Sequence, residues 1–271
     1  YTFIMTNTLP LYLDCNATTP LDPRVREAML HYFDVDYGNA GSRTHEYGTR
    51  AKQAVQTARN QVAALIRCES DEVIFTSGAT ESNNLAILGL AKHGEQSGRK
   101  HIVTTQIEHK AVLEPVEELE RRGFEVTRVP PTPGGWVEPS AVLSVLRPDT
   151  LLVSVMHANN ETGVIQPLDE ILDGMKDQPA YFHTDAAQTF GKIIAPLQNP
   201  RIDLISISGH KIYGPKGIGA LITRRRGYDR IPLTPLMFGG GQERGLRPGT
   251  LPVPLIVALG LAAELAGKEC K

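Results

Sequence analysis

The sequence has few cysteines, no excess of charge and no long apolar run, and each of these absences excludes a class of protein. Only Cys15, Cys68 and Cys270 are present, with no C-x-x-C pair, which argues against a disulfide framework or a zinc cluster and points to a reducing cytoplasm. The 28 Lys and Arg residues nearly balance the 30 Asp and Glu residues, so no nucleic-acid partner is expected. No apolar run approaches the roughly 20 residues of a membrane span, so no membrane is expected either.

The first ten residues, YTFIMTNTLP, lack a charged region followed by a long apolar stretch, and no signal peptide is expected. The remaining composition is that of a globular protein, since 41% of the 271 residues are hydrophobic. This length allows one large domain, or one domain and part of another.

From residue 50 onward, helical and strand-like patterns alternate along the chain, which predicts an α/β fold with a mostly parallel sheet covered on both faces. The expected strands are 72–76, 101–105, 124–130, 151–156, 180–185 and 203–208, and the expected helices are 51–66, 81–94, 111–123, 141–147 and 168–177. Residues 217–223 follow too soon for a helix to intervene, so they are expected to pair antiparallel to 203–208. Residues 251–271 have the pattern of a long helix.

Two further motifs are not expected to bind a ligand. Residues 209–214 have the glycine spacing of a P-loop, but Pro215 stands where the lysine of that motif belongs, so an NTPase is not expected. The basic run Arg224–Arg226 is predicted to be a solvated loop rather than a phosphate-binding patch.

Small and polar residues follow the first two predicted strands, at the edge where ligands bind in open parallel sheets. Residues 77–80 (SGAT) lead into a helix, and such a turn offers backbone N–H groups and the positive end of a helix dipole to a phosphate. Alternatively, Ser77 or Thr80 only caps the helix. His109 follows the second strand, either as a structural residue or as an imidazole that stacks on an aromatic cofactor or moves protons.

The later strands end in amides and a carboxylate. Asn159 and Asn160 follow the fourth strand, either as turn residues or as donors to a phenolate-like oxygen. Asp185 follows the fifth strand and is followed by Gln188; it either caps a helix or pairs with a cation, because a buried carboxylate needs a partner. The sequence His183-Thr184-Asp185 is not expected to bind a metal, since no second ligand pair stands nearby.

Two lysines follow the sixth strand, in the sequence SGHKIYGPKG. Lys211 comes directly after Ser208 and His210, where the other polar groups converge, and an amine kept neutral there is a nucleophile. Lys216 is expected to be a turn lysine that faces solvent or a loop carbonyl. A phosphate cradle, a stacking candidate, amides, a buried carboxylate and a lysine together predict a site for pyridoxal phosphate.

Seven motifs, in order and spacing, resemble the NifS/IscS-type cysteine desulfurases of the class V aminotransferase family. They are YLDCNATTPLDPRV, FTSGATESNNLAI, EHKAVL, MHANNETGV, HTDAAQTFGK, SGHKIYGPKGIGAL and GGGQERGLRPGTLP. The resemblance implies the pyridoxal-phosphate fold type I, like that of aspartate aminotransferase, with a mostly parallel seven-stranded sheet. It also implies an N-terminal segment 1–20 associated with a small domain, a large cofactor-binding domain 21–255, and, in 256–271, the start of a helix leading to a C-terminal small domain that is absent here.

The resemblance also implies the role of each site residue. Lys211 attaches the cofactor and moves the α-proton of the substrate, Asp185 pairs with the ring nitrogen and keeps it charged, and His109 stacks on the ring and takes part in proton transfer. The other roles are phosphate binding by Ala79, Thr80, Ser208 and His210, contact with the phenolic oxygen and the substrate by Asn160 and Gln188, and contact of Thr250 with the phosphate in the partner subunit. The implied assembly is an obligate homodimer.

The implied reaction converts L-cysteine to L-alanine and leaves a persulfide on the enzyme, from which an acceptor protein takes the sulfur. Neither the nucleophilic cysteine nor the arginine that binds the substrate carboxylate is expected in this chain, because both belong to the C-terminal domain of the family. Cys15-Asn16 and Pro248 resemble the branch that supplies sulfur for DNA phosphorothioation. The alternatives are selenocysteine lyase, an aminotransferase, or a sulfur-assembly scaffold without catalysis.

Overall fold

One seven-stranded sheet organises the chain. The computed structural model describes residues 10–270, so part of the predicted segment 1–20 lies outside the described residues. The strand order is β1-β7-β6-β5-β4-β2-β3, in which β7 runs antiparallel to both of its neighbours and the other pairs are parallel. The strands are β1 Val73–Thr76, β2 His101–Thr105, β3 Glu125–Val129, β4 Thr150–Ser154, β5 Tyr181–Asp185, β6 Leu204–Ser208 and β7 Gly219–Thr223. The predicted sheet is therefore confirmed, including the antiparallel seventh strand.

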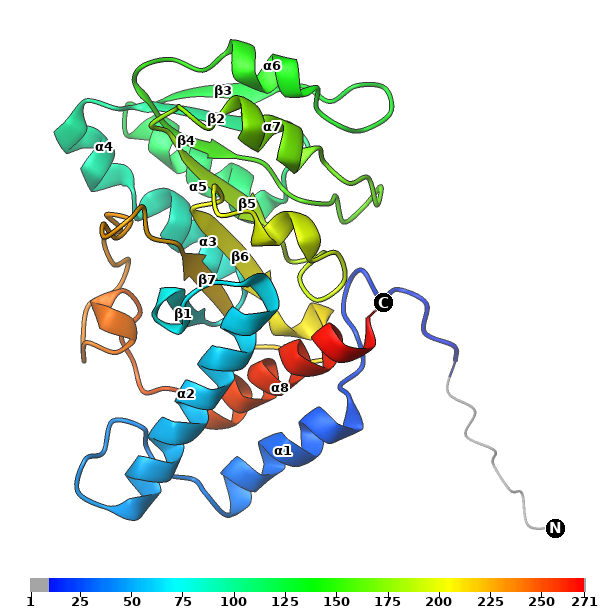
Figure 1. Cartoon of the computed structure of the whole chain (residues 1–271), viewed down its shortest axis with the longest axis vertical. Helices are drawn as coiled ribbons and strands as arrows, with labels where there is room; N and C mark the ends of the chain where they lie inside the picture. Colours follow the sequence, from blue (N-terminus) through cyan, green and yellow to red (C-terminus); the bar gives the residue numbers. More distant parts are fainter. Residues whose placement is uncertain (1–9, 271) are drawn as a thin grey trace.

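Helices cover both faces of this sheet, as expected (Figure 1). They are α1 Pro23–Asp34, α2 Glu46–Ile66, α3 Ala79–Leu88, α4 Ala91–Ser97, α5 Lys110–Arg121, α6 Pro139–Ser144, α7 Leu168–Gly174 and α8 Val253–Glu269. Two buried apolar clusters lie on opposite faces because strand side chains alternate: Phe75 belongs to the cluster with α2 and α8, and Ile74 to the cluster with α3 and α5. In the part of the chain that is described, no helix is long and apolar enough to cross a membrane.

Several helices differ from the prediction in their bounds, since α2 begins at Glu46 rather than at 51 and α6 and α7 each end three residues earlier than expected, and two differences go further. Residues 81–94 were expected to form one helix, but Thr234 donates two hydrogen bonds to the carbonyl oxygen of Gly89, at 2.9 and 3.0 Å, and α3 ends there before α4 begins. Helix α1 was not predicted; Asp22 caps its first turn through the backbone N–H of Arg24. The long C-terminal helix is confirmed as α8, which packs on α1 and α2. The domain division at residue 255 falls within α8 and stays a prediction.

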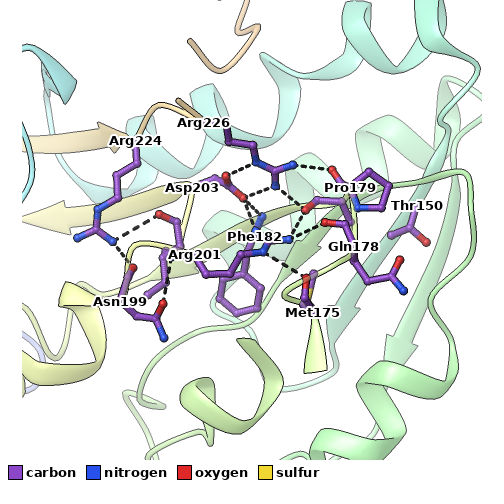
Figure 2. Close-up of polar contacts among 12 residues, drawn as sticks. Thr150, Met175, Gln178, Pro179, Phe182, Asn199, Arg201, Asp203, Arg224 and Arg226 are labelled. Carbon is purple, nitrogen blue, oxygen red and sulfur yellow. Dashed lines mark hydrogen bonds and ion pairs between the residues drawn. The ribbon is translucent and has the colours of Figure 1, made fainter. Parts of the chain in front are cut away.

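The basic run Arg224–Arg226 is not a solvated loop, contrary to the prediction. Arg224 is 5% exposed and donates hydrogen bonds to backbone carbonyls. These carbonyls belong to Ile66, Leu197, Asn199 and Ile202. Arg226 and Arg201 converge on the buried carboxylate of Asp203, with N–O distances of 2.7 to 2.8 Å (Figure 2). Arg224 can be buried, and Arg201 and Arg226 half-buried, because carbonyls and a carboxylate satisfy them at the amino-terminal ends of β5 and β6.

Candidate functional site

A cavity of about 680 Å³ opens beyond the carboxyl ends of the central strands, at the opposite edge from the Asp203 cluster. Such a volume is typical of sites for small molecules. Nine of the ten predicted site residues line it: Ala79, Thr80, His109, Asn160, Asp185, Gln188, Ser208, His210 and Lys211. The tenth, Thr250, is exposed and is not among the residues that line the cavity. The polar residues predicted at the strand ends therefore do line one cavity. Thr250, which was predicted only from the family resemblance, does not line it.

One end of the cavity is formed by the first turn of α3. No side chain caps this helix, so neither Ser77 nor Thr80 has the capping role that was the alternative reading. Gly78 has a φ of 152°, a conformation that favours glycine and exposes the backbone at the turn. Ser208 and His210 face the same space from the end of β6. Uncapped N–H groups, a hydroxyl and an imidazole form a cradle suited to a phosphate.

Asp185 lies deep in the cavity and is 6% exposed. Its Oδ1 accepts a hydrogen bond from the backbone N–H of Ala187 at 2.9 Å, and its Oδ2 accepts one from Nδ2 of Asn83 at 2.7 Å. Burial raises the pKa of Asp185, and these two neutral donors oppose that shift. Within residues 10–270 no ion pair reaches this carboxylate, so a cationic donor in the cavity is the partner that it lacks.

Lys211 extends from the 3₁₀ helix Gly209–Lys211 into the cavity. Its amine donates hydrogen bonds to the backbone carbonyl of Asn16 and to that of Ala17, the latter at 2.9 Å. Burial lowers the pKa of Lys211, and the positive charge of Lys192 lowers it further, while Asp185 opposes the shift. A lysine with a lowered pKa beside a buried carboxylate is the arrangement expected of a nucleophilic amine.

His109 and the predicted amides occupy the side of the cavity. His109 caps α5, because its Nδ1 accepts a hydrogen bond from the backbone N–H of Ala111 at 3.0 Å, and its ring also lines the cavity. The two asparagines have different roles. Oδ1 of Asn159 stabilises a turn by accepting hydrogen bonds from the backbone, whereas Asn160 lines the cavity. Gln188 donates to the carbonyl of Asn16 at 2.9 Å. Both readings of His109 are therefore compatible with its position.

The histidine beside Asp185 is not placed as a metal ligand. Nδ1 of His183 lies 2.8 Å from Oγ of Ser154, and Nε2 lies 3.0 Å from Oγ of Ser206, so both ring nitrogens are occupied inside the sheet. Burial lowers the pKa of His183 to about 3. Over the described residues, no group of three or more His, Cys, Asp or Glu side chains is placed to hold a metal ion.

Several residues that line the cavity were not predicted. Asn83 is buried on α3, with its Oδ1 unpaired, and only its contact with Asp185 marks it as part of the site. Asn16 and Ala17 cover Lys211 with backbone carbonyls, which residue type does not reveal. Lys216 was expected to be a turn lysine that faces solvent or a loop carbonyl; it is exposed, but it also lines the cavity.

Pyridoxal phosphate fits these residues. Its phosphate matches the uncapped turn of α3, and its protonated ring nitrogen supplies the cation that the buried Asp185 lacks. Lys211, which lines the same cavity, offers the amine to which its aldehyde attaches. The chemistry of the donor set thus supports the cofactor that the sequence predicts.

Comparison with known proteins gives concordant results. The aminotransferase class-V family model matches residues 11–270. The cysteine desulfurase IscS of Anaeromyxobacter dehalogenans is 54% identical over 261 residues, which are 96% of this chain and 64% of that protein. The crystal structure of DndA from Streptomyces lividans matches at 58% identity with a TM-score of 0.88, covering 96% of this chain and 73% of that one. A structure of SspA in complex with cysteine matches at 43% identity and a TM-score of 0.87, covering 94% and 72%.

The chain thus spans about 64% of the length of the curated relatives that it matches. These matches confirm the predicted family and the fold, and the class-V aminotransferases and cysteine desulfurases use pyridoxal phosphate. The family model, the sheet order and the cavity together show that the chain belongs to the aminotransferase class-V family.

Proposed function

We propose that the protein containing this chain is a pyridoxal-phosphate-dependent cysteine desulfurase, which converts L-cysteine to L-alanine and passes the sulfur on through an enzyme-bound persulfide. The observation that carries the proposal is the pair formed by Lys211 and Asp185, which face one cavity and influence each other's pKa. Relatives named cysteine desulfurase and a neighbour solved in complex with cysteine support the substrate.

When bound, pyridoxal phosphate withdraws electrons from the substrate carbon that bears the amino group. Asp185 is proposed to keep the ring nitrogen of the cofactor protonated, because a buried carboxylate is stable as an anion only beside a cation. Asn83 and the backbone N–H of Ala187 fix the direction of this carboxylate. The chain thereby sets the charge on which the electron withdrawal depends.

Lys211 is proposed to bind the cofactor and then to move the substrate proton through its Nζ. Burial and the charge of Lys192 lower the pKa of Lys211, which increases the fraction of neutral amine able to accept a proton. The carbonyls of Asn16 and Ala17 orient the amine. With Nδ1 of His109 accepting a backbone hydrogen bond, the free nitrogen for a second proton transfer is Nε2.

The thiol that accepts the sulfur is proposed to lie outside the cavity-lining residues of this chain. None of Cys15, Cys68 and Cys270 lines the cavity. Burial raises the pKa of Cys68 to about 12, which keeps it a thiol at neutral pH. All three cysteines are unpaired, which supports the proposed cytoplasmic location.

Thr250 supports the proposal of a homodimer. It is exposed and does not line the cavity of its own chain, so a contact with a phosphate would have to be made in the partner subunit. The sulfur acceptor is proposed to be another protein. The DNA phosphorothioation branch is supported by the 58% identity to DndA and by Cys15 and Pro248; it is the second candidate for the pathway served, and the proposal involves no direct contact with nucleic acid.

The test is to incubate the full-length protein with L-cysteine and to measure its products and its visible absorption. We expect alanine and sulfur in equal amounts, together with an absorption band that Lys211→Ala abolishes and that Lys110→Ala leaves unchanged. Lys110 is the matched control because it is an exposed lysine near the cavity that does not line it.

Other outcomes would support the alternatives. Pyruvate or another keto acid in place of alanine would contradict desulfuration and favour a different reaction, such as an aminotransferase. Turnover of selenocysteine with none of cysteine would indicate a selenocysteine lyase. A wild-type protein without any absorption band would indicate a scaffold without catalysis.

A further inference from the structure

The loop between Lys211 and β7 is fixed at both of its ends. The backbone N–H of Gly214 donates to the carbonyl of Gly209 at 3.0 Å, and the N–H of Gly209 donates to the carbonyl of Ile218 at 2.9 Å. The loop then meets the turn of α3, since a Cβ atom on Gly219 would lie only 2.6 Å from Cα of Gly78. Because β7 lies between β1 and β6 in the sheet, this loop lies between the first turn of α3, which follows β1, and Ser208 and His210 at the end of β6.

Lys216 projects from this fixed loop. Gly217, directly after it, has a φ of 83°, which lets the chain turn sharply at this point. Lys216 lines the cavity together with Thr80, Ser208 and His210. Its charge also contributes, after burial and Lys211, to the lowered pKa of His210. Across residues 10–270 the amine of Lys216 has no hydrogen-bond or ion-pair partner.

The cradle has little positive charge from any other source. Among the described residues, two lysines, Lys211 and Lys216, and no arginine line the cavity. The amine of Lys211 is occupied by the carbonyls of Asn16 and Ala17. The lowered pKa of His210 leaves its imidazole neutral at pH 7. A phosphate carries a charge of about −1.5 to −2 at that pH, and neutral donors alone do not balance it.

We propose that Lys216 is a further phosphate-binding residue, whose ammonium supplies the counter-charge for the phosphate of the cofactor held at the first turn of α3. A lysine suits this position because its compact charge on a flexible stem neutralises a phosphate without a fixed geometry. From the sequence, Lys216 was expected only to be a residue of the turn. Its position at the cavity gives it a chemical role as well, which is to bind the phosphate. The inference rests on the proposed cofactor site.

The test is a binding titration of the cofactor-free chain with two ligands that differ only in the phosphate group, pyridoxal phosphate and pyridoxal. We expect Lys216→Met to weaken pyridoxal phosphate binding by at least about tenfold, as the loss of a charge-assisted contact does, and to change pyridoxal binding by less than about twofold. Inorganic phosphate should compete with pyridoxal phosphate less well in the variant. Lys216→Arg should restore most of the affinity, because the charge returns.

The control is Lys110→Met, which removes one positive charge near the cavity without removing a residue that lines it. It should leave the affinity for both ligands unchanged. Equal weakening of both ligands in Lys216→Met would mean that the loop was distorted, and no weakening of either would mean that Lys216 does not touch the phosphate; each result overturns the inference. A wild-type chain that binds neither ligand would instead contradict the proposed cofactor site.

Discussion

Glu108 is a buried carboxyl group next to His109, and sequence reasoning gave it no role. It is 6% exposed, and its Oε1 accepts hydrogen bonds at 2.8 Å from the hydroxyl of Thr105 and from the backbone N–H of Met156. Its Oε2 is buried without a partner. Burial raises the pKa of Glu108 to about 8, and the negative charge of Asp185 adds to the shift. Glu108 is therefore largely protonated at neutral pH.

Replacing this carboxyl group should change how stability depends on pH. The pKa in the folded chain, about 8, is above the value of about 4.3 for an unfolded glutamate, so protonation favours the folded state. That contribution is complete below about pH 4.3 and is lost as the pH rises through 8. We therefore expect the free energy of unfolding of the wild type, relative to Glu108→Gln, to fall by an amount on the order of a few kcal/mol between pH 5 and about 8.

Urea unfolding of the cofactor-free chain at several pH values measures this difference. Glu114→Gln is the control, since Glu114 is an exposed carboxyl on α5, the helix that begins two residues after Glu108. Its pH profile should run parallel to that of the wild type. If Glu108→Gln also runs parallel to the wild type, Glu108 is not protonated in the folded chain.

The sequence predicted those site residues whose type and strand-end position already indicate chemistry. Lys211 and Asp185 are polar residues that follow apolar strands, and a parallel sheet brings such ends together. Asn83 and Glu108 are missed because they lie in a helix and a turn, and only three-dimensional contacts show that they border Asp185. Contacts made by backbone carbonyls, such as that of Asn16 with Lys211, cannot be predicted from residue type, because every residue has a carbonyl.

At the scale of elements, the strands were predictable because each is a short apolar run between polar turns, and all seven lie within two residues of their expected bounds. The errors arose where a distant segment supplies a partner. Thr234 ends α3 by binding the carbonyl of Gly89, across 145 residues of sequence. The sequence alone predicts that Arg224 and Arg226 are solvated, because it does not show their partners. These are backbone carbonyls for Arg224 and the carboxylate of Asp203 for Arg226.

The loop that carries Thr250 is attached to the sheet through Glu243. This residue is 7% exposed, and its carboxylate accepts hydrogen bonds from Arg59 of α2 at 2.5 and 2.8 Å and from the backbone N–H of Phe75 at 2.7 Å. Glu243 and Arg244 have φ values of 45° and 59°, a conformation that side chains rarely adopt. The ion pair holds the loop in this conformation against its strain.

Breaking this ion pair should destabilise the chain strongly. In Glu243→Gln the size of the side chain is kept, but Arg59 is left buried without a counter-charge, and we expect a loss of about 3 kcal/mol in the free energy of unfolding. Urea unfolding measures it, with Lys268→Ala as the control. Lys268 pairs with Glu264 on the exposed surface of α8, where a pair contributes less than about 1 kcal/mol. A loss in Glu243→Gln no larger than that of the control would contradict the proposed anchor.

At the scale of the whole molecule, an exposed apolar segment directly precedes the loop of Thr250. Leu236, Met237 and Phe238 are 40%, 46% and 89% exposed. They lie in the orange segment of Figure 1, at the side of the sheet near β1 and β7. Clustered apolar side chains of this kind mark interaction surfaces. Because the proposed homodimer requires Thr250 to reach the partner subunit, we expect this segment to be buried between the two subunits.

Phe238→Asp should therefore prevent dimer formation, since it places a charge in an apolar contact. Analytical ultracentrifugation should show a dimer for the wild-type chain and a monomer for the variant, with a circular dichroism spectrum unchanged. Trp136→Asp is the matched control, because Trp136 is also an exposed aromatic residue, at 41%, and lies in the loop before α6. It should remain dimeric. A Phe238→Asp variant that stays dimeric would place the contact elsewhere, and a monomeric wild type would contradict the homodimer formed by this chain.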